Sequence, residues 1–176
     1  MRKLSLMTLA ILLAFTSLKS VAGEAEVNFE GVEDYTDFEP ADGIEKRFQE
    51  KRMEELKDYL GKLAEDLPDG QMLSMTVTDI DLTGRLEPTF GQSASSHIRI
   101  VRTIDFPTMD FSYQLKSADG RVIKEADVNL KDMSFEFDTT ATRHTRNDAL
   151  YFEKKMLRDW FIDTFRDQAN PPAESA

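Results

Sequence analysis

The strongest constraint on the fold is a strict alternation of apolar and polar residues that runs into a tight-turn signal. Residues 109–115 alternate Met, Phe, Tyr and Leu with polar side chains, which is the pattern of a strand with one buried face. The following segment, 118–120, ends in Gly120, which supplies the positive φ of a hairpin turn. Residues 122–130 predict the returning strand, and residues 133–137 extend it after a shift in phase.

Two other segments have the spacing of helices. Apolar residues recur at three- and four-residue steps over 43–66 and form one face, opposite a charged one. Asp42 and Glu45 predict a capping box at the start of this helix, and Thr145 with Asp148 predicts another at the start of a C-terminal helix that carries Trp160.

Three further strands complete the prediction. Residues 27–29 predict a short strand, residues 71–83 a long one, and residues 98–105 a second long one. The apolar set of the 71–83 segment changes phase, which predicts a bulge near Thr78. The order strand, helix, four strands, helix indicates an α+β fold: an antiparallel four- to five-stranded sheet with two helices packed on one face.

The N-terminus has the features of a secretory signal peptide. Arg2 and Lys3 precede an apolar run over 4–18, which is shorter than a membrane span, and small residues then lead to a cleavage site near Ala22. We therefore expect a signal peptide over 1–22, a single domain over 23–167 and a disordered tail over 168–176. The location expected for this domain is the periplasm, and the expected state is a monomer.

Composition limits the function. The chain has 22 basic and 33 acidic residues, a formal net charge of −11, so neither nucleic acid nor an anionic membrane surface is an expected partner. No stable membrane insertion is expected after signal cleavage. The chain has no cysteine, which excludes thiol catalysis and cysteine-held metals. We expect no cofactor, and a partner that is a periplasmic protein or a small ligand.

Paired carboxylates are the first candidate site. Asp79 and Asp81 alternate along one strand and so share a face, with Arg85 and Arg99 near in sequence. Such a pair is compatible with a structural ion-pair edge, with acid–base chemistry or with a divalent cation.

Two further candidates lie in connecting segments. The long segment 84–97 lacks periodicity and carries Phe90 as a candidate anchor of a binding loop. Arg143, His144 and Arg146 form a basic island ahead of the predicted helix start, where an anion could bind. The plainer interpretation of the segment 84–97 is an ordinary hairpin connection, and that of the basic island is solvated surface charge.

Five segments resemble a known family: VNF at 27–29, YTD at 35–37, VTDIDLTGRLEP at 77–88, IRIVR at 98–102 and YFEKKMLRDWF at 151–161. The family is a group of secreted proteobacterial proteins catalogued as a domain of unknown function. The resemblance implies a location in the Gram-negative envelope and brings no activity or catalytic residue with it.

No catalytic motif is present in the sequence. The leading hypothesis is a non-enzymatic binding or envelope-accessory domain. The alternatives are a carboxylate-dependent hydrolase of envelope glycan that uses Asp79 or Asp81, and a divalent-cation binder.

Overall fold

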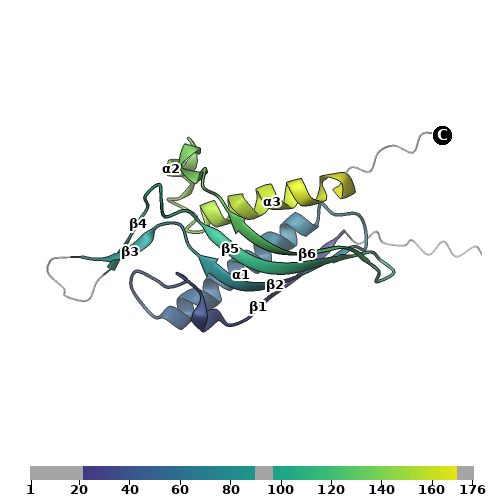
Figure 1. The fold of residues 1–176 in the computed structure, drawn as a ribbon, viewed down its shortest axis with the longest axis horizontal. Helices are drawn as coiled ribbons and strands as arrows, with labels where there is room; N and C mark the ends of the chain where they lie inside the picture. The colour runs from purple at the N-terminus through teal and green to yellow at the C-terminus, as the bar shows by residue number, and fades with distance from the viewer. Residues whose placement is uncertain (1–21, 90–96, 170–176) are drawn as a thin grey trace, which may run out of the picture.

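A computed structural model describes residues 22–89 and 97–169. Figure 1 shows a curved sheet with two long helices along it and a small hairpin that projects from one end. The long elements are β1 (Glu24–Phe29), α1 (Glu45–Ala64), β2 (Met72–Asp81), β5 (Thr108–Lys116), β6 (Val122–Lys131) and α3 (Tyr151–Ala169). The shorter ones are η1 (Val32–Asp34), β3 (Arg85–Pro88), β4 (His97–Ile100), η2 (Phe135–Phe137) and α2 (Ala141–His144).

The main sheet is mixed, and the prediction of a purely antiparallel sheet is wrong. Its strand order is β1-β2-β5-β6, with β1 parallel to β2 and the other neighbours antiparallel. The reason is the helix between the first two strands, because a chain that leaves β1 and returns along α1 enters β2 in the same direction. The β5–β6 hairpin is confirmed, and Gly120 in its turn has φ 83°.

The segment after β2 leaves the main sheet, which the sequence did not predict. Gly84 has φ +85° and turns the chain outward, and its N–H donates to the carbonyl of Asp105 at 2.9 Å. β3 then pairs with β4 in a separate two-stranded sheet. The predicted strand over 98–105 therefore ends at Ile100, and the segment 84–97, predicted to be a connection without periodicity, contains β3 and the first residue of β4.

The predicted bulge in β2 is confirmed. Its register against β5 shifts between Val77 and Asp79. Buried side chains alternate up to Val77 and resume in the other phase at Ile80, so the extra residue keeps both halves of the strand facing the core.

Both long helices contribute to one hydrophobic core. Leu56 and Leu60 of α1 are buried, and Trp160 of α3 packs edge-on against Phe111 and Tyr113 of β5, with ring centroids 4.8 and 5.3 Å apart. No helix within the described ranges is both long and apolar enough to cross a membrane.

The predicted helix starts are wrong in detail. The N-cap of α1 is Ile44, without a side-chain hydrogen bond, so Asp42 does not form a capping box. Thr145 instead donates to the carbonyl of Ala141, and α3 begins later, after Asp148 accepts the N–H of Leu150 at 3.0 Å. The predicted strand extension over 133–137 contains the short helix η2.

Candidate functional site

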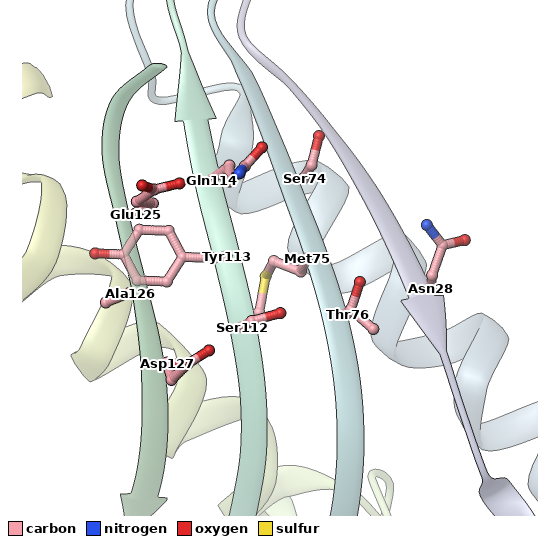
Figure 2. Close-up of a pocket in the computed structure, with 10 residues that line it drawn as sticks. All are labelled: Asn28, Ser74, Met75, Thr76, Ser112, Tyr113, Gln114, Glu125, Ala126 and Asp127. Atoms are coloured by element: carbon pink, nitrogen blue, oxygen red, sulfur yellow. Dashed lines mark hydrogen bonds between the residues drawn. The ribbon is translucent and has the colours of Figure 1, made fainter.

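A polar hollow lies on the sheet face opposite the core. Ser74 and Thr76 of β2 stand opposite Gln114 and Ser112 of β5 in the register of the two strands. Figure 2 shows these side chains on the near side of the strands, with helices behind the sheet. The hollow has a volume of about 500 Å³. Its lining is completed by Asn28, Met75, Tyr113, Glu125, Ala126 and Asp127.

Carboxylates give this polar face a negative charge. Glu125 accepts a hydrogen bond from the amide of Gln114 at 2.9 Å, and Asp127 stands opposite Ser112. Further along the same face, Asp110 stands opposite both Asp79 and Asn129. Hydroxyl and amide groups that both donate and accept, with carboxylates at the side, suit a polar ligand that carries positive charge.

A second hollow, of about 370 Å³, lies where β2 ends. Arg99 of β4 donates two hydrogen bonds to the carboxylate of Asp37, each at 2.8 Å. The same guanidinium donates to the carbonyls of Gly84 at 3.0 Å and Glu39 at 2.9 Å. This fork–fork geometry is the strong form of an ion pair, and it ties the small hairpin to the end of the main sheet.

Asp79 and Asp81 have different environments at this end of β2. Asp79 accepts hydrogen bonds from the backbone N–H and the hydroxyl of Thr36, both at 2.7 Å. Asp81 lines the second hollow. Burial, together with the nearby charges of Asp37 and Asp79, raises the pKa of Asp81 to about 6, and Arg99 opposes this rise. Asp105 also lines the hollow, and one of its carboxylate oxygens is buried without a hydrogen-bond partner among the described residues.

A buried acid lies behind this site. Glu153 of α3 is 1% exposed and accepts hydrogen bonds from the N–H of Thr83 at 2.8 Å and from its hydroxyl at 2.9 Å. Burial raises the pKa of Glu153, against the lowering effect of these bonds. Among the described residues, its other oxygen has no hydrogen-bond partner.

The sequence candidates around the acidic pair are only partly brought together. Arg99 binds Asp37 rather than Asp79. Arg85 lines the second hollow, and its Nη2 lies 3.6 Å from Oε1 of Glu87. Phe90 lies outside the described residues.

The basic island is divided between two neighbouring hollows. Arg143 and Arg146 line one of about 540 Å³. His144 stacks on Tyr151, with ring centroids 5.0 Å apart, and lines another of about 600 Å³. Arg143 and His144 belong to the last turn of the four-residue α2, so they do not stand at the start of the long helix as predicted.

Sequence reasoning missed Asp37, Asp105 and Glu153. Asp37 lies in a segment without periodicity, and Glu153 is one acid among many on a helix. The polar face was signalled by the polar half of the alternation, which was used only to find the strands. Within residues 22–89 and 97–169, no group of three or more His, Asp or Glu side chains is placed to hold a metal ion.

The fold and these hollows define an α+β domain with one helix-covered and one polar sheet face. The chain belongs to the family described as protein of unknown function DUF3016, whose model matches residues 23–163. No curated protein matches the chain significantly. Four of the segments that carry the resemblance lie at or next to the second hollow. Two of them line it through Asp37 and Asp81, a third supplies Arg99, which binds Asp37, and the fourth supplies Glu153, which binds Thr83.

Proposed function

We propose that this protein is an exported, periplasmic, non-enzymatic binding protein that takes a positively charged polar ligand on the open face of its main sheet. The observation that carries the proposal is the hollow of about 500 Å³ over β2 and β5, whose lining includes hydroxyls, two amides and two carboxylates. The formal net charge of −11 supports it, because an anionic body attracts cationic ligands.

Export is supported by the signal-peptide pattern of residues 1–22 and by the start of the family match at residue 23. N-terminal sequencing of protein recovered from the periplasm is expected to read from Gly23 or Glu24. Native protein that stays in the cytosol with Met1 attached would contradict export.

A lysine decapeptide is a suitable probe of the polar face. Calorimetry is expected to detect binding that weakens with salt, and no binding of a glutamate decapeptide. Asp127→Asn removes a lining charge and Ser112→Tyr fills the hollow, so both are expected to weaken binding. The matched controls are Glu33→Gln and Glu54→Gln, on exposed positions outside the hollow. Equal losses in lining and control variants would show that net charge, rather than the hollow, attracts the peptide.

A second candidate function is supported by Asp81 alone. A carboxyl with a pKa of about 6 is still partly protonated near neutral pH and can act as a general acid. A hydrolase of envelope glycan would use Asp81 in this role, whereas both oxygens of Asp79 are engaged by Thr36. Release of soluble fragments from peptidoglycan is the assay. Asp81→Asn should abolish it and Asp79→Asn should not, and the absence of turnover by the unaltered protein would end this candidate.

A further inference from the structure

The long strand β6 leaves one edge of the main sheet open. In the described part of the chain, β6 stands last in the strand order and pairs with β5 alone. Residues 122–127 are all exposed. An open edge of this length is a template for another strand, so its backbone and its charges show which strand fits.

One hydrogen bond shows which residues of β6 direct their backbone groups to the open edge. The N–H of Asp132 donates to the carbonyl of Pro107 at 3.2 Å, so the backbone of Asp132 faces β5. Because backbone direction alternates along a strand, every second residue before Asp132 also faces β5. Four residues therefore direct their N–H and C=O groups to the open edge: Glu125, Asp127, Asn129 and Lys131.

We propose that two copies of this chain pair β6 with β6 in antiparallel fashion, about a two-fold axis beside Val128. With Val128 opposite its own copy, Glu125 stands opposite Lys131 of the second copy, and Asp127 opposite Asn129. Symmetry repeats each pair. These are residues whose backbone groups face outward, so this register allows the cross-strand hydrogen bonds and also pairs Glu125 with Lys131.

The neighbouring registers are less favourable. Centring the axis on Asp127 places that carboxylate against its own copy and Lys131 against Ile123. Centring it on Asn129 places Asp127 against Lys131 but leaves Glu125 opposite Met133. Of these three registers, the one centred on Val128 places both acids, Glu125 and Asp127, opposite a neutral or basic polar partner within β6.

Pairing in this register joins the two four-stranded sheets into one. Side chains opposite each other across an antiparallel pair lie on the same face, so the polar face of one copy continues into that of the other. Lys124 does not obstruct the edge, because its ammonium donates to the carbonyl of Thr164 on α3 at 2.8 Å. The sequence predicted a monomer, whereas this proposal makes the chain a two-fold dimer.

A charge swap tests the pairing. Sedimentation velocity of the chain from residue 23 onward is expected to show a dimer that dissociates on dilution. Glu125→Lys places Lys opposite Lys131, and Lys131→Glu places Glu opposite Glu125, so each change alone should raise the dissociation constant about tenfold or more. The double variant restores opposite charges and should restore the dimer. Glu54→Lys, on an exposed position of α1, makes the same charge change away from the edge and should leave the dimer intact.

A second variant tests the backbone. Asp127→Pro removes an outward N–H without touching the bonds to β5, and proline is tolerated on an edge strand. It should give a folded monomer, with circular dichroism as the check of folding. A wild-type chain that is monomeric at every concentration, or a double variant as weak as the single ones, would overturn the proposal. If the wild-type chain is monomeric at every concentration, the open edge of β6 remains available to pair with an extended segment of another protein.

Discussion

Removing the side chain of Arg99 is expected to destabilise the protein more than removing the side chain of an arginine in an exposed ion pair. Arg99 makes four charge-assisted hydrogen bonds, two of them to Asp37, and the two side chains are 21% and 17% exposed. Hydrogen bonds to charged groups contribute about 1.5–3 kcal/mol each when buried. Since these groups keep some contact with water and their bonds are not additive, Arg99→Ala should lower the free energy of unfolding by about 3 kcal/mol.

The assay is urea unfolding followed by the fluorescence of Trp160, the single tryptophan of the chain. A loss of about 3 kcal/mol corresponds to a fall in Tm of about 6–12 °C for a domain of this size. A double-mutant cycle with Asp37→Asn should give a coupling energy of about 1–3 kcal/mol. The matched control is Arg166→Ala, because Arg166 and Asp163 pair at the same 2.8 Å but are 67% and 74% exposed. Equal effects of the two arginine variants, or a coupling energy near zero, would refute the reasoning.

Three further predictions concern the same end of the sheet. Burial raises the pKa of Glu153, so the unfolded chain loses this proton more readily than the folded protein as pH rises above 4.5, and Glu153→Gln should be as stable as the unaltered protein or more stable at pH 7. Glu153→Ala should instead lower the free energy of unfolding by about 1–3 kcal/mol, because it leaves the donors of Thr83 without their acceptor. Urea unfolding at pH 5 and pH 7 measures both effects. The raised pKa of Asp81 likewise makes the free energy of unfolding fall as pH rises from 3.8 to about 6, by about 1–2 kcal/mol after solvent screening. Asp81→Asn should flatten this part of the plot of stability against pH. An unchanged slope would contradict the raised pKa of Asp81. Gly84→Ala should cost about 1–3 kcal/mol in thermal unfolding, because Gly84 has φ +85° and a Cβ there would lie 2.8 Å from the carbonyl of Ile100; no change in Tm would mean that the turn relaxes freely.

The sequence predicted those elements whose signal is local. The alternation over 109–115 gave β5, the three- and four-residue spacing gave α1, and the change of phase near Thr78 gave the bulge. Each of these patterns records the burial of a segment's own faces. They therefore identify an element without reference to its neighbours.

The relations between distant segments could not be predicted. Arg99 and Asp37 are 62 residues apart, and Thr83 and Glu153 are 70 residues apart. An alternating strand has the same pattern whether its neighbour is parallel or antiparallel, so the direction of β1 was missed. The exit of the chain at Gly84 was missed because one glycine indicates a turn but not its direction.

The parallel pairing of β1 with β2 has a consequence for the order in which the chain folds. The hairpin of β5 and β6 closes over a short turn, whereas Glu24 meets Met72 only after the whole of α1 has been brought across. Closing the longer loop costs more chain entropy before any contact is gained. We therefore expect β1 to be the last strand to join the main sheet. The kinetic nucleus should lie in the second half of the polypeptide, with φ-values near zero along β1.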